Sequence, residues 1–148
     1  MGLMFMSESE KYLNKMINLE KLIETKNFQI DEINSILYKI KTTNIQSDKV
    51  QSSGNNNNYV IEKMIDEKIK YEKELDDNIS NMIKLKRECS VMIDKIDNNI
   101  YKIILYKYYF NNETYDKIAD YCGYSTRWIQ ELHSKALKEF DKIYNSSY

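Results

Sequence analysis

The chain has 148 residues, no proline, only three glycines and a formal net charge of −1. This length suits one or two small domains, and the scarcity of residues that interrupt helices favours an all-α fold. The sequence contains no run of about twenty apolar residues, which excludes a helix that spans a membrane. The near-neutral charge also excludes the strongly basic class of nucleic-acid-binding proteins.

The N-terminus and the cysteines indicate a cytoplasmic protein. Residues Met1–Met6 are apolar but lack a basic leader and a cleavage site of small residues, so a signal peptide is not expected. Cys89 and Cys122 lie far apart on apolar helical faces, which predicts free thiols in a reducing compartment. Because no histidines cluster around them, a zinc site is not expected either.

Residues Glu8–Lys41 form the first predicted helix, which has a nearly heptad apolar seam. The seam comprises Tyr12, Met16, Leu19, Ile23, Ile30, Ile33, Leu37 and Ile40, and Lys26 takes the skipped position. A second set of apolar residues, Leu13, Ile17, Leu22 and Ile36, would widen the buried stripe beyond that of a coiled-coil dimer. The helix is therefore expected to bury much of its surface.

A polar stretch from Thr42 to Asn58 follows and is predicted to be an exposed loop, with the run Asn55–Asn58 as a surface insertion. The second long helix is predicted over Tyr59–Ile96. Its seam comprises Ile61, Ile65, Leu75, Ile79, Met82, Cys89, Ile93 and Ile96, weakened by Lys68, Glu72 and Lys86. Residues 1–96 should therefore fold as an antiparallel hairpin. Because two helices alone have a thin core, the hairpin should either dimerise or pack on the C-terminal domain.

Residues 97–148 form the second predicted domain, which contains three helices. Asp97–Asn99 mark a helix start, and the nearly all-apolar segment from Ile100 to Tyr109 is predicted to be a buried helix, since a strand there would have no partner. The other two helices are expected over Tyr115–Tyr121 and from Thr126 to about Ile143. Thr114 and Ser125 are expected to cap their N-termini, and Gly123 to allow a left-handed turn between them.

The stretch from Thr114 to Lys142 predicts a helix-turn-helix, whose second helix can lie in a DNA major groove. The apolar residues of both helices fall on one side at helical spacing: Ile118, Ala119 and Cys122, then Ile129, Leu132, His133, Ala136, Leu137 and Phe140. The alternative is a small helical hairpin that only buries its own apolar face.

The candidate DNA contacts follow from a rotation of 100° per residue about the final helix. The side chains expected to face outward are Arg127, Glu131, Ser134 and Lys138, and those expected to flank them are Trp128, Gln130 and Lys135. Thr126 is a further candidate in the first turn, near the buried edge. Arg127 suits bidentate recognition of guanine, and Gln130 suits adenine or a phosphate. Lys135 and Lys138 suit phosphates, whereas Glu131 suits either cytosine N4 or a pair with Arg127. Trp128 could stack on a sugar edge or pack on the first helix.

Three further candidates precede this helix: Tyr115 and Lys117, at a helix N-terminus that suits a phosphate, and Tyr124, in the turn. His133 occupies an apolar-face position, so a buried imidazole is expected rather than a ligand or catalyst. Tyr101, Tyr106, Tyr108, Tyr109 and Tyr121 are expected to be core aromatics. No phosphate loop, nucleophile with a base, or paired carboxylate site is present, so neither an enzyme nor a cofactor is predicted.

The spacing I-A-x-x-x-G-x-S-x-x-x-I-x-x-x-x-x-x-A-L, from Ile118 to Leu137, resembles the fourth region of bacterial sigma factors, which reads the promoter −35 element. Together with the loop Lys49–Gly54, it also resembles small sigma-factor-like phage and prophage proteins of Gram-positive bacteria. These were long catalogued as a domain of unknown function and are related to activators of late phage genes. The resemblance covers nearly the whole chain and implies a DNA-binding transcriptional regulator.

The charge of the last domain predicts that DNA binding needs help. Its cations are Lys102, Lys107, Lys117, Arg127, Lys135, Lys138 and Lys142, nearly balanced by Glu113, Asp116, Asp120, Glu131, Glu139 and Asp141. The expected partners are double-stranded DNA together with either RNA polymerase or a second copy of the chain bound through the long helices. Two other functions stay open: a DNA-packaging adaptor like a small terminase subunit, and a helical module that binds only proteins.

Overall fold

The structure of the protein is a computed structural model that describes residues 6–46 and 54–147, with side chains at residues 6–43 and 58–147. Its elements are α1 (Glu8–Gln46), α2 (Gly54–Asp94), α3 (Asn99–Leu105), η1 (Tyr106–Phe110), α4 (Tyr115–Cys122) and α5 (Thr126–Ser147). Every regular element in these ranges is a helix, so the predicted all-α class is confirmed. The chain divides into two compact units, which we call the hairpin unit, Lys21–Ser80, and the terminal unit, Met1–Glu20 with Asn81–Tyr148.

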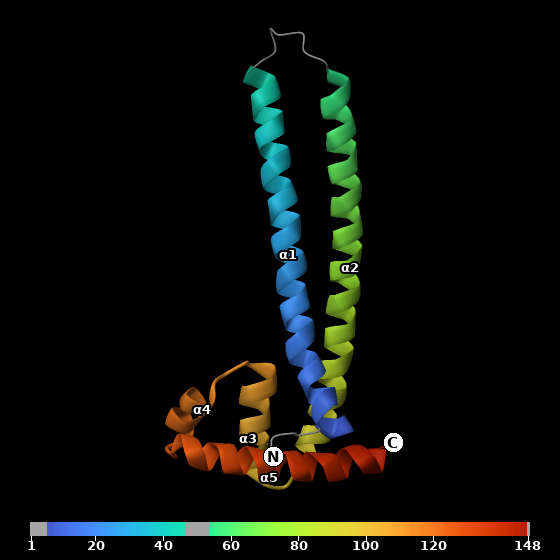
Figure 1. Ribbon diagram of the computed structural model, residues 1–148. Coiled ribbons are helices and arrows are strands. Elements are labelled where there is room, and N and C mark those ends of the chain that lie inside the picture. The colour runs from blue at the N-terminus through green and yellow to red at the C-terminus, as the bar shows by residue number, and fades with distance from the viewer. Residues whose placement is uncertain (1–5, 47–53, 148) are drawn as a thin grey trace. The chain divides into compact units, whose positions relative to one another are not determined.

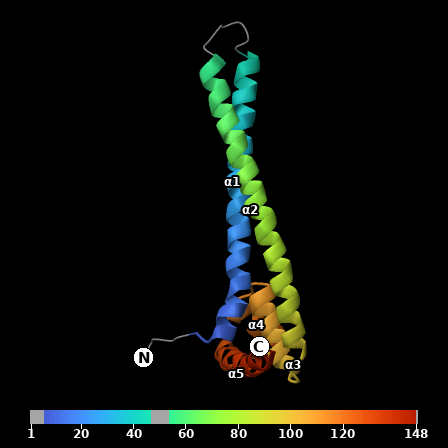
Figure 2. The same ribbon diagram turned by 90° about the vertical axis from the view of Figure 1, so that its right-hand side faces the viewer.

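In the hairpin unit, α1 and α2 run side by side in opposite directions, as Figure 1 and Figure 2 both show. The predicted seam residues Ile30 and Ile33 are buried between them. Lys26 forms an ion pair with Glu74 and lies 4.6 Å from the centre of the Tyr71 ring. The lysine that takes the skipped position of the seam is therefore paired with a carboxylate, and its ammonium lies over an aromatic face.

The hairpin buries less surface than the sequence predicts. Leu22 and Ile36, expected to widen the stripe on α1, are 48% and 43% exposed, and the predicted seam residue Ile65 is 41% exposed. Each helix of a two-helix pair has only one neighbour, so only a narrow stripe is covered. The loop prediction was also too long, because α1 continues to Gln46 and α2 already begins at Gly54. Residues 47–53 of that loop lie outside the described residues.

The terminal unit contains the main core of the protein. This core comprises Tyr12, Leu13, Met16, Leu85, Cys89, Met92, Ile93, Ile96, Leu105, Tyr109, Ala136 and Phe140. Its members come from the start of α1, the end of α2 with Ile96 just after it, α3 with η1, and α5. The compact unit therefore extends beyond the predicted boundary between residues 96 and 97. A module of about 50 residues has little core of its own, and the ends of the long helices supply the missing apolar surface.

A second, smaller core belongs to the three C-terminal helices alone and comprises Ile104, Ile118, Ala119, Ile129 and Leu132. The helix predicted over Ile100–Tyr109 is present as α3 followed by η1. In η1 the Asn111 N–H donates to the Tyr106 carbonyl oxygen at 3.1 Å, a five-residue spacing that widens the helical turn. Tyr109 is fully buried, whereas Tyr121, also predicted to be a core aromatic, is 67% exposed.

Candidate nucleic-acid interface

Local interactions in the sequence set the turn between α4 and α5. The Thr114 hydroxyl accepts the Lys117 backbone N–H at 3.3 Å and caps α4, and the Ser125 hydroxyl accepts that of Trp128 at 3.1 Å and caps α5. Gly123, between the two helices, has φ of 73°. A Cβ at that position would meet no atom within 4 Å, so backbone conformation rather than space favours glycine there. All three predictions for this turn are confirmed.

The inner face of α5 is fixed by apolar packing and by one polar cluster. Ile129, Ala136 and Phe140 are fully buried, as the sequence predicts. His133 is 6% exposed, and its ring nitrogens bond two tyrosines. The Tyr109 hydroxyl lies 2.9 Å from Nε2 and the Tyr115 hydroxyl 2.7 Å from Nδ1. This cluster ties η1 and α4 to α5 and orients the final helix.

Burial shifts the titration of this cluster. The pKa of His133 is lowered to about 4 because burial removes water from the charged imidazolium. Burial likewise raises the pKa of Tyr115 to about 12, with a further contribution from the neighbouring Tyr108. His133 is therefore neutral at neutral pH and accepts hydrogen bonds through one nitrogen only. The expectation of a buried imidazole is confirmed.

Nine of the predicted contact residues lie on the outer surface. These exposed residues are Lys117, Tyr124, Arg127, Trp128, Gln130, Glu131, Ser134, Lys135 and Lys138. Five of them, Arg127, Gln130, Glu131, Ser134 and Lys138, follow one another at spacings of one, three and four along α5. They form a continuous row opposite the buried face, which we call the outer row.

Two predicted contacts are directed inward instead. Tyr115 is half-buried, with its hydroxyl on His133 and its ring stacked on Tyr108 at 5.1 Å between centroids. The Thr126 hydroxyl donates to the Asp116 carboxylate at 2.7 Å and thereby joins the first turns of α5 and α4. Both residues hold the helix-turn-helix together, and their hydroxyls are already engaged by the protein.

Several charges near the outer row are partly compensated within α5. Arg127, whose side chain is 90% exposed, lies 4.0 Å from Glu131, and Lys142 lies 3.2 Å from Glu139. The Lys135 ammonium lies 5.2 Å from the centre of the Trp128 ring, which is 39% exposed. Among the described residues, Lys117 and Lys138 form no ion pair. These two lysines are the cations of the helix-turn-helix best placed for phosphates.

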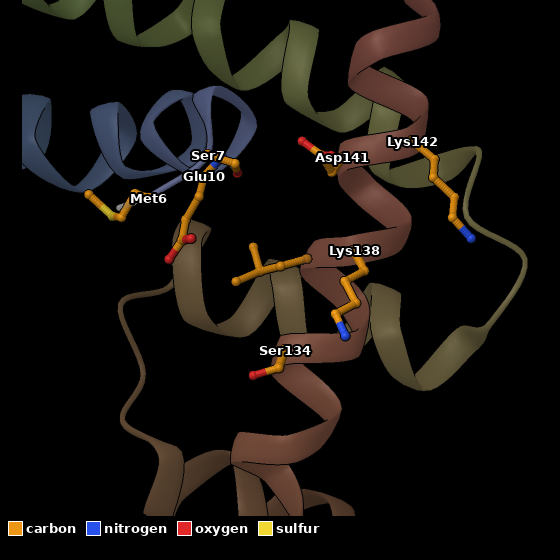
Figure 3. Close-up of a pocket in the computed structure, with 8 residues that line it drawn as sticks. Met6, Ser7, Glu10, Ser134, Lys138, Asp141 and Lys142 are labelled. Carbon is orange, nitrogen blue, oxygen red and sulfur yellow. The ribbon is translucent and has the colours of Figure 1, made fainter. Parts of the chain in front are cut away.

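A groove of about 630 Å³ runs between the start of α1 and the second half of α5, and both of its walls belong to the terminal unit. It is lined by Met6, Ser7, Glu10, Ser134, Leu137, Lys138, Asp141 and Lys142. Figure 3 shows Glu10 extending from α1 into the space beside α5, and Lys142 pointing away from α1. The sequence did not predict this groove, because nothing local relates residues near position 10 to residues near position 138.

The start of α1 is fastened to α5 by hydrogen bonds. The Ser7 hydroxyl accepts the Glu10 backbone N–H at 3.1 Å and caps α1. The Ser9 hydroxyl, which is nearly inaccessible to solvent, donates to the Asp141 carboxylate at 2.6 Å. Ser7 just before a helical pattern could have been identified as a cap from the sequence, whereas the contact between Ser9 and Asp141 could not.

Comparisons with known proteins leave the family of the chain open. No protein-family model, curated protein or solved structure matches it. Within the described ranges no three His, Cys, Asp or Glu side chains are grouped so as to hold a metal ion. In the same ranges, none of the helices combines the length and apolar character needed to cross a bilayer.

Proposed function

We propose that the terminal unit binds double-stranded DNA through α5 and that the protein regulates transcription of phage or prophage genes. The observation that carries this proposal is the outer row of α5. It presents arginine, glutamine, glutamate, serine and lysine side chains to solvent, while Ile129, Ala136 and Phe140 on the opposite face of the same helix are fully buried. A rigid helix with exposed donors on one face can enter a major groove and contact base edges. The resemblance to sigma region four supplies the promoter context.

The proposal assigns different roles along the outer row. Arg127 and Gln130, near the N-terminus of α5, are assigned to base edges, as in helix-turn-helix proteins whose recognition helix reads bases with its first turns. Lys138, two turns later, and Lys117, near the start of α4, are assigned to phosphates on either side. Glu131 competes with DNA for Arg127, because the two side chains already pair.

The charge balance implies weak binding by one copy. The few unpaired cations allow only a small number of phosphate contacts, and each contact loses strength as salt rises. Affinity for a promoter would then come from a second protein surface, either RNA polymerase or another copy of the chain. The proposal therefore includes a protein partner that raises the affinity for DNA at physiological salt. At low salt, the isolated chain should bind DNA without this partner.

Selection of bound fragments from a random duplex library tests the proposal. The full chain is incubated with the library at low salt, bound duplexes are sequenced, and the enriched sequence is measured by fluorescence anisotropy over a salt series. We expect one enriched motif, with affinity that falls steeply with salt. If no motif is enriched and no duplex binds at the lowest salt, the protein is not a DNA-binding regulator.

The hairpin unit favours a second candidate function, a module that binds other proteins. Large apolar side chains are exposed along both of its helices. The exposed set comprises Leu22, Phe28, Ile36, Tyr38, Tyr59, Val60, Ile65 and Ile69. An exposed apolar surface of this kind is typical of protein interaction sites. A chain that acts only in this way would show no duplex affinity at any salt concentration, which separates it from the proposal above.

A further inference from the structure

The groove beside α5 has an acidic residue of α1, Glu10, on one wall and Lys138 of the outer row on the other. Glu10 lies one residue after Ser9, whose hydroxyl is bonded to Asp141 of α5. The cap formed by Ser7 fixes the same turn of α1. Because the backbone on both sides of the groove is held, the Glu10 carboxylate stays near α5 instead of moving with a free chain end.

Glu10 and Lys138 carry opposite charges on the two walls of this groove. Within the part of the chain that the structure describes, neither side chain forms an ion pair of its own. The charge of Glu10 also reaches into the helix-turn-helix. Burial raises the pKa of Tyr115 in α4, Tyr108 raises it further, and Glu10 adds a smaller contribution. Figure 3 shows the Glu10 side chain extending from α1 into the groove beside α5.

We propose that Glu10 is a built-in counter-charge that lowers the affinity of the outer row for DNA, by competing with a phosphate for Lys138. This inference rests on the proposed DNA-binding function and adds a regulatory element to it. A phosphate that binds Lys138 enters the groove that Glu10 also lines and is repelled by its negative charge. This repulsion weakens as the salt concentration rises. The start of α1 thereby makes binding by a single copy weaker than the cations of α5 alone would allow.

The test uses Glu10→Gln in the full chain, because glutamine keeps the size of the side chain and removes its charge. The matched control is Glu8→Gln. Glu8 is exposed in the first turn of α1, pairs with Lys11 and does not line the groove. Binding of a short fluorescent duplex of mixed sequence is measured by anisotropy over a salt series. Circular dichroism checks that all variants keep the same helix content.

We expect Glu10→Gln to raise duplex affinity about threefold to tenfold at low salt and Glu8→Gln to leave it nearly unchanged. The slope of log affinity against log salt should become steeper in Glu10→Gln, by up to about 0.9, because one more phosphate contact forms. In the double variant Glu10→Gln with Lys138→Ala the gain should disappear, which identifies Lys138 as the competing partner.

The possible failures are distinguishable. If the unmodified chain binds the duplex but Glu10→Gln and Glu8→Gln behave alike, the counter-charge is overturned and DNA binding stands. If Glu10→Gln still raises duplex affinity when Lys138 is also changed to alanine, Glu10 does not compete for Lys138. The proposed counter-charge on Lys138 is then overturned. If neither the unmodified chain nor Glu10→Gln binds any duplex at the lowest salt, the proposed function is overturned and the inference with it.

Discussion

The terminal unit and the hairpin unit are both built from helices, yet they bury very different amounts of apolar surface. Phe140 in the terminal unit is 0% exposed, and Phe28 in the hairpin unit is 65% exposed. In the described part of the hairpin unit, only Ile30 and Ile33 are buried. The difference shows that a helical apolar stripe becomes a core only where helices cover it from several directions. Stability and the orientation of α5 therefore depend on the terminal unit.

The largest expected effect comes from a matched pair of phenylalanines. Phe140→Ala should lower the free energy of unfolding of the terminal unit by about 4 kcal/mol, because it leaves a cavity in the main core. Phe28→Ala should change it by less than about 0.5 kcal/mol, since the ring is already exposed to solvent. Urea unfolding followed by the fluorescence of Trp128, the single tryptophan, measures both. Equal losses in the two variants would contradict the contrast between the units.

Acid should weaken the terminal unit through the only histidine of the chain. The folded pKa of His133, about 4, lies below its ordinary value of 6.5, so the unfolded chain takes up the proton first. The neutral His133 therefore stabilises the folded protein fully above pH 6.5. This stabilisation is lost as the pH falls toward the pKa of His133 in the folded protein. By about pH 5 the loss should be about 2 kcal/mol.

Urea unfolding at neutral pH and near pH 5 measures this loss. In His133→Gln, the free energy of unfolding should fall less between neutral pH and pH 5, by about the amount that His133 contributes. The remaining fall comes from carboxylates, which both proteins share. An unchanged difference would show that His133 does not couple to folding.

DNA discrimination should depend on Arg127 and not on the other arginine of the chain. If Arg127 contacts a guanine, Arg127→Ala should cut discrimination between the selected site and its guanine substitutions by about tenfold. Arg87, exposed on α2, is the matched control, and Arg87→Ala should leave discrimination unchanged. Anisotropy titrations with the selected duplex and its guanine-substituted versions measure this discrimination as a ratio of affinities. Equal discrimination by Arg127→Ala and the unmodified chain would remove Arg127 from the base contacts.

The turn between α4 and α5 should be sensitive to the residue at position 123. Gly123→Ala should lower the free energy of unfolding by about 1 kcal/mol, because a side chain at φ of 73° is strained even in open space. Gly123→Asn should cost less, since asparagine tolerates this conformation better. Thermal unfolding of the two variants measures the difference. Equal losses would indicate that something other than backbone conformation favours glycine.

The smallest expected effect separates phosphate contacts from the general charge of the chain. Lys138→Ala should weaken binding to all duplexes alike, by about twofold to fivefold, and make the salt dependence shallower. Lys70→Ala, at an exposed position in the hairpin unit, removes the same charge and should have almost no effect. A salt series on both variants measures this. An equal loss in the Lys70 variant would indicate long-range attraction without a phosphate contact.

Local features of the fold followed from the sequence. The caps at Thr114 and Ser125, the left-handed Gly123 and the buried face of α5 depend on residues a few positions apart, so their spacing predicted them. The same spacing also placed Arg127, Gln130 and Lys138 on the outer surface of α5.

The features missed by the sequence analysis depend on contacts between distant segments. The main core joins residues near positions 13, 93 and 140, and the groove joins Glu10 to Lys138. Neither follows from helical periodicity, which describes one helix at a time. The position of Tyr115 near a helix start predicts a phosphate contact at the surface. The buried His133 instead provides its hydroxyl with a partner, and Tyr108 of η1 stacks on its ring.

The tyrosine–histidine–tyrosine cluster has a consequence for the direction of its hydrogen bonds. A neutral imidazole carries one hydrogen and one lone pair, so Tyr109 and Tyr115 cannot play the same part toward it. One hydroxyl gives its hydrogen to the ring, and the other receives one from the ring. If the imidazole changes tautomer, both hydroxyls must exchange their donor and acceptor roles at the same time. The ¹⁵N chemical shifts of the ring would report which tautomer the native protein adopts.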